Sequence, residues 1–124
     1  GYNNGNIDTL DEFLAPGVVW LTAPPGAPPG REGLKGMVAT FRAAFPDLQV
    51  TIVEQVAEGD TVATRTASTG THRGALQGVA ATGKEVAIEG SAFMRIAAGR
   101  IVEVWGVADQ LGLMHQIGAV PSPG

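Results

Sequence analysis

The chain has 124 residues, of which 44% are hydrophobic and 16% are charged, and its formal net charge is −4. This length suits one domain, and the composition is typical of a globular protein rather than a disordered one. The acidic balance argues against a nucleic-acid partner, because phosphate binding needs clustered Lys and Arg, and the absence of cysteine excludes disulfides, thiolate nucleophiles and cysteine-based metal sites.

The first residues of the chain contain no sign of export. Residues 1–13 have neither a basic start nor an apolar core, as a secretion signal would. Residues 13–30 carry no charge, but their five prolines would break a membrane-spanning helix. We therefore expect no membrane partner and a soluble, cytoplasmic protein, in which residues 1–124 form a single domain and residues 118–124 are a tail.

A short helix, a strand and a longer helix are predicted for the first part of the chain. Leu10, Phe13 and Leu14 recur at helical spacing within residues 8–14, and the Pro-Gly step at 16–17 ends that helix. Residues 18–23 then form an apolar strand, and a Pro-rich loop follows. Residues 31–45 repeat apolar side chains at helical intervals, and the following proline ends this main helix.

Four strands joined by short turns are predicted next, at residues 48–58, 61–74, 84–97 and 100–109. Short turns between consecutive strands favour antiparallel pairing. A final short helix covers residues 110–118. Helices first and a run of strands afterwards predict an α+β fold, in which helices cover one face of a curved sheet.

The alternation of side chains along the last two predicted strands indicates which residues share a face of the sheet. One face of the first carries apolar or small residues and is expected to face the interior: Val86, Ile88, Gly90, Ala92, Met94 and Ile96. On the second strand, Val102, Val104, Gly106 and Ala108 share one face, whereas Ile101, Glu103, Trp105 and Val107 share the other. Both faces of this strand are largely apolar, which predicts a second buried surface that suits a dimer interface.

The run "GTHRGALQGVAATGKEVAIEGSAFMRIAAGRIVEVWGVADQLGLMHQIGA" resembles the SnoaL-like polyketide cyclases, which have the nuclear transport factor two-like fold. Residues 3–20 and 30–50 also look like the family's opening and central helix. The resemblance implies a cone-shaped α+β barrel, whose curved mixed or antiparallel sheet wraps around helices and encloses an apolar pocket. It also implies a homodimer formed through the outer face of the sheet. The family's first helix is largely absent from this sequence.

The resemblance also shows where this chain departs from the family. In the ring-closing members, the general acid/base is an Asp one residue after the position of Trp105, and histidines at neighbouring inward positions assist it. Those positions hold Gly106, Ala92 and Val104 here, none of which can transfer a proton. The resemblance therefore implies an apolar chamber for a hydrophobic, polyketide-like small molecule, without metal or cofactor. The ligand-binding positions expected are Trp20, Phe41, Ile88, Ala92, Met94, Val104 and Gly106.

Two functions fit this pattern, and a third fits it less well. The first is ring closure by conformational confinement of the substrate, with Asp109 or His72 as polar help. The second is a non-catalytic carrier or sensor of hydrophobic small molecules on the same scaffold. The third is epoxide-opening hydrolase chemistry, which needs two carboxylates around a water, whereas only Asp109 is expected inside.

Asp109 and His72 are the candidate catalytic residues, and each has a structural alternative. Asp109 follows a strand and precedes a helix, where Asp commonly accepts backbone N–H bonds as an N-cap; in an apolar cavity it would instead become a usable acid. His72 lies at a turn near the expected cavity mouth, where it would donate to a substrate carbonyl or serve as a packing histidine. A metal role is weak, because His115 is the only other histidine.

Overall fold

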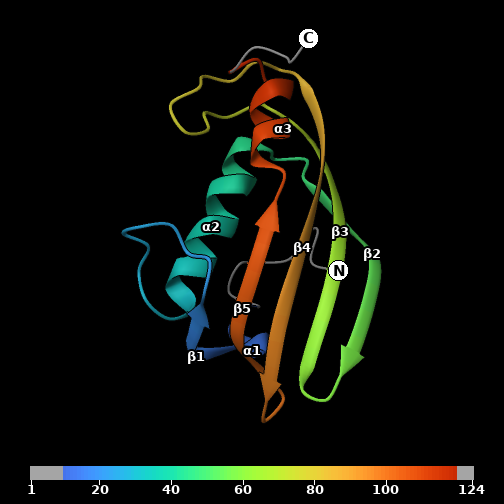
Figure 1. Cartoon of the computed structure of the whole chain (residues 1–124). Helices are drawn as coiled ribbons and strands as arrows, with labels where there is room; N and C mark the ends of the chain where they lie inside the picture. Colours follow the sequence, from blue (N-terminus) through green and yellow to red (C-terminus); the bar gives the residue numbers. More distant parts are fainter. Residues whose placement is uncertain (1–9, 120–124) are drawn as a thin grey trace.

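A computed structural model of the chain describes residues 10–119 as an α+β fold with one five-stranded sheet (Figure 1). The strands, in the spatial order β1-β5-β4-β3-β2, are β1 Leu14–Trp20, β5 Arg100–Ala108, β4 Glu85–Ala97, β3 Thr61–Thr71 and β2 Gln49–Glu58. The helices are α1 Leu10–Phe13, α2 Arg31–Ala44 and α3 Gln110–Gln116. The predicted α+β class is confirmed. None of the described helices has the length and apolar character that crossing a membrane requires.

Strands β2, β3, β4 and β5 form the predicted antiparallel meander, and β1 joins the free edge of β5 in parallel. Gly59 lies in the turn between β2 and β3, and Gly99 lies in the turn between β4 and β5. Their φ angles are 60° and 78°, a conformation that glycine adopts without steric cost. The parallel β1–β5 pair makes the sheet mixed. It also brings the start of the chain beside its last strand.

The predicted end of the first helix and the predicted bounds of the first strand were wrong, and residues 8 and 9 of that predicted helix lie outside the described residues. A helix was expected over residues 8–14 and a strand over 18–23, but β1 already begins at Leu14 and ends at Trp20. Pro16 lies inside β1, where the pairing with β5 is irregular between Leu14 and Val19. Because β1 is an edge strand, it tolerates a residue that cannot donate a ladder hydrogen bond.

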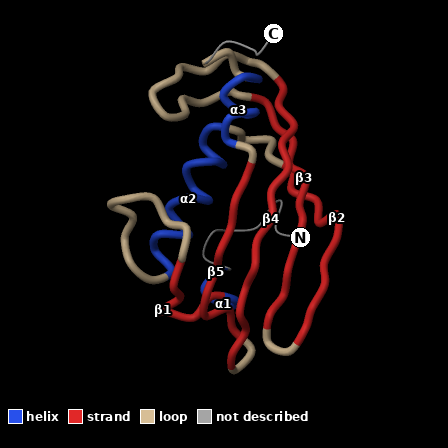
Figure 2. The backbone as a smooth tube through the Cα atoms, in the orientation of Figure 1, coloured by secondary structure: helices blue, strands red, loops and turns tan. Residues whose placement is uncertain are grey.

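Helices and loops pack on one face of the sheet, which we call the inner face. Two hydrophobic clusters fill its two ends. The α3 cluster consists of Ala44, Phe45, Leu76, Val86, Leu113 and Ile117, and the α1 cluster consists of Leu14, Val18 and Leu34. Helix α3 lies where β5 ends and α1 lies near the opposite end, whereas β2 forms the edge farthest from α2 (Figure 2). Burying each large apolar side chain contributes about 1.5–3 kcal/mol.

One face assignment on β5 was also wrong. The sequence placed Ile101 on the face opposite Val104, but Ile101 packs against the α1 cluster together with Val104. The pairing with β4 shifts between Arg95, which lies opposite Glu103, and Ile96, which lies opposite Ile101. Val102 is the extra residue of this bulge, so strict alternation fails there.

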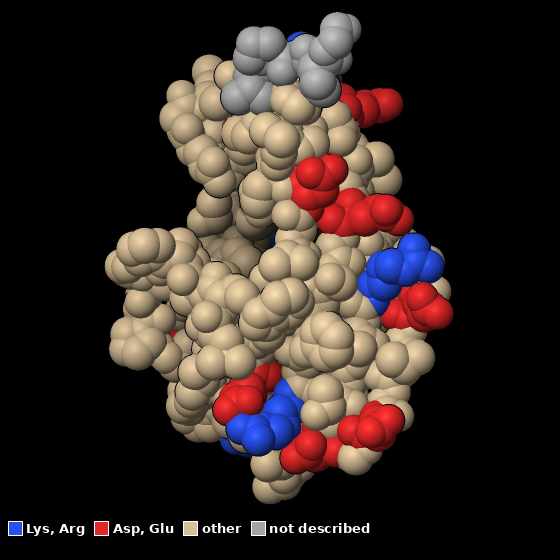
Figure 3. All heavy atoms as spheres, in the orientation of Figure 1, with Lys and Arg blue, Asp and Glu red and all other residues tan. Residues whose placement is uncertain are grey.

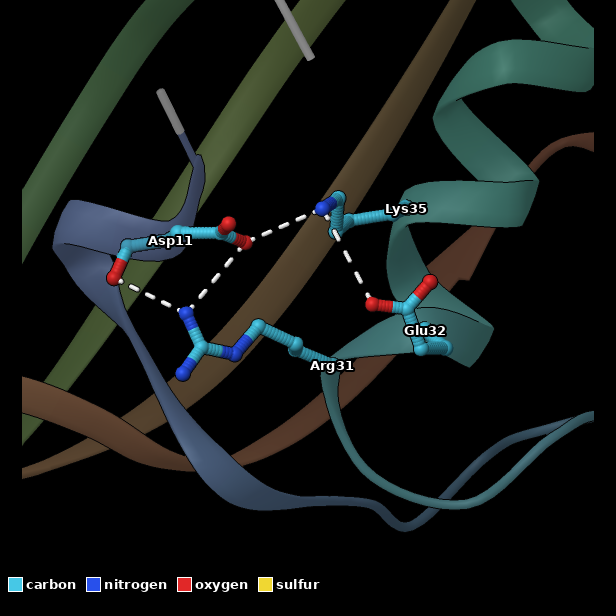
Figure 4. A network of polar contacts seen from close by, with 4 residues as sticks. All are labelled: Asp11, Arg31, Glu32 and Lys35. Carbon is cyan, nitrogen blue, oxygen red and sulfur yellow. Dashed lines mark hydrogen bonds and ion pairs between the residues drawn. The ribbon is translucent and has the colours of Figure 1, made fainter. Parts of the chain in front are cut away.

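Ion pairs connect α1 to the start of α2 (Figure 4). The Asp11 carboxylate lies 3.3 Å from Arg31 Nη1 and 3.1 Å from Lys35 Nζ, and Lys35 also lies 3.8 Å from Glu32. Hydrogen bonding to Lys35, more than to Arg31, lowers the pKa of Asp11 below its ordinary value. The network fixes the short α1 helix against α2 beside the α1 cluster.

Candidate functional site

The centre of the inner face is a patch of four small residues between the two clusters. Ala92 of β4 lies opposite Gly106 of β5, and Gly90 lies opposite Ala108 one pair further along. We call these four residues the small-residue patch. A Cβ atom built on Gly106 would lie 3.7 Å from Ala92 Cβ, which is ordinary contact. No side chain longer than a methyl group therefore projects from the patch itself.

Polar side chains border the patch on both sides. After β1, the Thr22 hydroxyl accepts from Gly106 N–H at 3.0 Å and donates to the Gly106 carbonyl at 2.8 Å. On the other side, Thr64 of β3 lies opposite Ala92, and its Oγ1 accepts from Gln55 Nε2 at 2.9 Å. One wall of the expected apolar chamber therefore carries a hydroxyl and an amide.

All seven predicted ligand-binding residues lie on the inner side of the sheet, but they fall into three groups. Phe41 and Ile88 pack against the α3 cluster. Trp20 and Val104 pack against the α1 cluster, and Met94 lies opposite Val104. The remaining two, Ala92 and Gly106, belong to the small-residue patch. The structure thus places the two smallest predicted residues between two apolar ends.

His72 is not at an open cavity mouth, where the sequence placed it. The residue is fully buried, and its ring lies 5.6 Å from the Phe45 ring. Thr82 N–H donates to Nδ1 at 3.3 Å, and Thr82 Oγ1 lies 2.9 Å from the same atom. An Nδ1 that accepts leaves the proton on Nε2, which has no hydrogen-bond partner among residues 10–119. This geometry agrees with the packing alternative, in which His72 holds the loop between β3 and β4, and the catalytic role of His72 stays a prediction.

Asp109 is the N-cap of α3, so the structural alternative for this residue is confirmed. Its carboxylate accepts from Gly112 N–H at 2.8 Å, and the residue is exposed. It borders a shallow hollow of about 230 Å³ that Arg65, Glu89 and Val107 also line, together with Gly90 and Ala108 of the small-residue patch. Arg65 and Glu89 belong to the outer face, where Arg65 forms ion pairs with Glu89 and Glu54. Asp109 therefore lies at the end of the small-residue patch, with its carboxylate held in the cap.

The outer face of the sheet carries exposed aromatic side chains. Phe93 and Trp105 are 51% and 40% exposed, and their rings meet edge to face at 5.8 Å. They line a second hollow, of about 180 Å³, together with Arg95 and Glu103. In Figure 3, charged atoms lie around an uncharged area over β4 and β5. The predicted second apolar surface is thus present and uncovered in the single chain.

The enclosed apolar pocket stays a prediction, because both of these hollows lie on the outer face. The surface is also hollowed between the loop after β1 and the α3 end of the molecule, where α2 lies behind (Figures 1 and 3). On the described strands, the inner face carries no Asp, Glu, His, Lys or Arg. Within residues 10–119, no three His, Asp or Glu side chains come together as metal ligands. The described inner sheet face therefore offers hydrogen bonds and shape, but no acid/base pair.

The comparisons with known proteins agree with this fold. The family model described as SnoaL-like polyketide cyclase matches residues 1–117. No curated protein matches the chain.

Several solved structures are similar over most of their length. A putative polyketide cyclase, IdmH from Streptomyces antibioticus, is 38% identical with a TM-score of 0.81, covering 94% of this chain and 90% of that one. TsrD from Streptomyces laurentii is 28% identical with a TM-score of 0.88, and the match covers 96% of this chain and 87% of TsrD. AclR from Streptomyces galilaeus, a putative hydroxylase, is 27% identical with a TM-score of 0.86, and the match covers 99% of this chain and 77% of AclR.

Proposed function

The chain belongs to the SnoaL-like polyketide cyclase family, and from this premise we propose that it binds a hydrophobic, polyketide-like chain against the small-residue patch and promotes ring closure by conformational confinement. The substrate lies along the inner face, with its apolar parts against the two clusters. The small residues leave room for the forming ring at the centre. The reaction needs no acid/base pair and no cofactor.

One observation carries this proposal. The three positions at which the family resemblance expects proton-transfer residues hold Gly106, Ala92 and Val104, and strand pairing puts all three on the inner face. A mechanism that moves a proton needs a donor or base within hydrogen-bond reach, which these residues do not supply. Holding two reactive ends together removes entropy from the barrier, by about 7–11 kcal/mol in ideal intramolecular cases. Shape alone thus suffices for a large rate effect.

The second candidate function is a non-catalytic carrier of hydrophobic small molecules. The same absence of ionisable side chains on the described inner sheet face favours it, because binding needs only apolar contact and a few hydrogen bonds. The two functions differ in one measurable quantity. A carrier binds the linear chain without changing its cyclisation rate.

The test uses a linear chain with a conjugated diene at one end and an α,β-unsaturated methyl ketone at the other. Binding is measured by calorimetry and cyclisation by chromatography with mass detection, against heat-inactivated protein. Acceleration supports the cyclase, and tight binding without acceleration supports the carrier. If the protein neither binds the chain nor accelerates its cyclisation, both proposals are overturned.

A pair of matched variants locates the site. Ala92→Phe fills the small-residue patch and should abolish binding, because the added ring occupies the space of the substrate. Ala97→Phe makes the same change at the exposed end of β4 and should leave binding intact. Equal binding by both variants would place the substrate elsewhere.

We propose, in addition, that two copies pair through the outer face. Phe93 and Trp105 supply an apolar centre, and the ion pairs of Arg65 and of Arg95 with Glu103 border it. A stable interface of this kind buries about 1,200–2,000 Å² in total. Sedimentation of the wild type and of Trp105→Glu tests the pairing: a wild-type dimer that the variant dissociates supports it, and a wild-type monomer refutes it.

A further inference from the structure

We infer that Thr64 donates a hydrogen bond from its hydroxyl to a carbonyl oxygen of the bound chain, with Gln55 as a positioning residue. This inference rests on the proposed function and specifies its substrate class: a polyketide-like chain with a carbonyl conjugated to one of the reacting double bonds. Thr64 would touch the substrate, whereas Gln55 would act through Thr64.

The position of Thr64 is the first part of the argument. Its backbone pairs with Ala92, and Ala92 in turn pairs with Gly106, so the three lie in one row across β3, β4 and β5. Opposite residues in a sheet have Cβ atoms about 4.5–5.5 Å apart. A ligand atom that rests on Ala92 therefore lies within reach of the Thr64 hydroxyl. Thr64 itself is only 7% exposed, so little water competes for this hydrogen bond.

The hydrogen-bond pattern is the second part. A hydroxyl has one hydrogen to donate and two acceptor lone pairs. Gln55 Nε2 donates to one of these lone pairs at 2.9 Å, and an amide N–H cannot accept in return. The hydroxyl hydrogen of Thr64 thus points away from Gln55, and it has no acceptor among residues 10–119. Gln55 fixes the hydroxyl in a donating orientation.

A neighbouring threonine provides the contrast. Thr66 lies two residues further along β3, and its hydroxyl donates to the Gly90 carbonyl at 3.4 Å. This hydrogen bond ties β3 to the β4 backbone and uses the donor of Thr66. Thr66 is therefore structural, although both hydroxyls belong to the same strand face.

A carbonyl-activated ring closure is accelerated by such a donor. In a cycloaddition of a diene onto a conjugated enone, two C–C σ bonds form, three π bonds become one, and no proton or leaving group departs. Negative charge develops on the carbonyl oxygen as the bonds form. A donor held at that oxygen in a water-poor site stabilises the transition state more than the ground state. The step balances without oxidant, reductant or cofactor.

The test compares the diene–enone ketone with an analogue in which a methylene replaces the carbonyl. Thr64→Val keeps the shape of the side chain and removes the hydroxyl, Thr64→Ser keeps the hydroxyl, and Thr66→Val is the matched control. We expect Thr64→Val to lower kcat for the ketone by about tenfold with little change in KM, and Thr64→Ser to restore it. Gln55→Met should give a smaller loss, again only for the ketone. Thr66→Val should keep the wild-type ratio of ketone to analogue turnover.

The outcomes separate this inference from the proposed function. If the wild type accelerates ring closure and folded Thr64→Val does so equally for the ketone, the inference is wrong and the proposed function stands. If Thr64→Val slows the ketone and its analogue alike, the role of Thr64 is structural and the inference is again wrong. If the wild type neither binds nor converts either compound, the proposed function fails first.

Discussion

Asp109 allows stability and catalysis to be tested at one residue. Its carboxylate caps α3 by accepting from Gly112 N–H at 2.8 Å. Replacing an N-cap Asp by Ala costs about 0.5–2 kcal/mol, whereas Asn caps about as well as Asp. With an unfolding entropy of about 2.1 cal/mol/K per residue, each kcal/mol lost from this chain lowers the melting temperature by about 4 °C. Asp109→Ala should therefore melt about 2–8 °C below the wild type, and Asp109→Asn close to it.

Turnover of the diene–enone ketone is the second measurement on the same variants. Because Asp109 is exposed and its carboxylate is held in the cap, both variants should stay within a few fold of the wild type once folded. General acid/base residues contribute about 10²–10⁴-fold. A loss of a hundredfold in Asp109→Asn, with an unchanged melting temperature, would refute this reasoning and make Asp109 a proton-transfer residue. An unchanged melting temperature in Asp109→Ala would refute the capping role.

Three further predictions concern stability. Hydrogen bonds from the Thr71 hydroxyl and N–H, each at 2.7 Å, lower the pKa of Asp47. The ionised Asp47 therefore stabilises the fold above the ordinary aspartate pKa of about 3.9. This stabilisation is lost as the pH falls through the pKa that Asp47 has in the folded protein. Urea midpoints measured across the acid range should therefore vary less with pH in Asp47→Asn than in the wild type, and parallel curves would contradict this. Leu113→Ala should lower the free energy of unfolding by about 2–5 kcal/mol in urea titrations, because Leu113 is fully buried in the α3 cluster; a loss below about 1 kcal/mol would show that α3 is not packed as described. His72→Ala should speed proteolysis within residues 73–83, because it removes the ring that Thr82 contacts, and an unchanged cleavage rate would show that His72 does not hold this loop.

Local patterns in the sequence determined much of this protein. The helical spacing in residues 31–45 and the alternation from Val86 to Met94 are properties of neighbouring residues, so they predicted α2 and the inner face of β4 correctly. The position of Asp109 between a strand and a helix predicted its capping role, since a cap also depends only on adjacent residues. Each of these features needs contacts over a few positions of the chain.

Only the tertiary structure decided which distant segments meet. The bulge at Val102 turned Ile101 inward, and the burial of His72 depended on Phe45 and Thr82 packing around it. The Gln55–Thr64 bond beside Ala92 follows from the register of three strands, and an irregularity in β2 precedes Gln55. The parallel β1–β5 pair brings Thr22 to Gly106, 84 positions away. Register is set by packing over the whole sheet, and a shift of one residue moves a side chain to the opposite face, so local periodicity does not specify it.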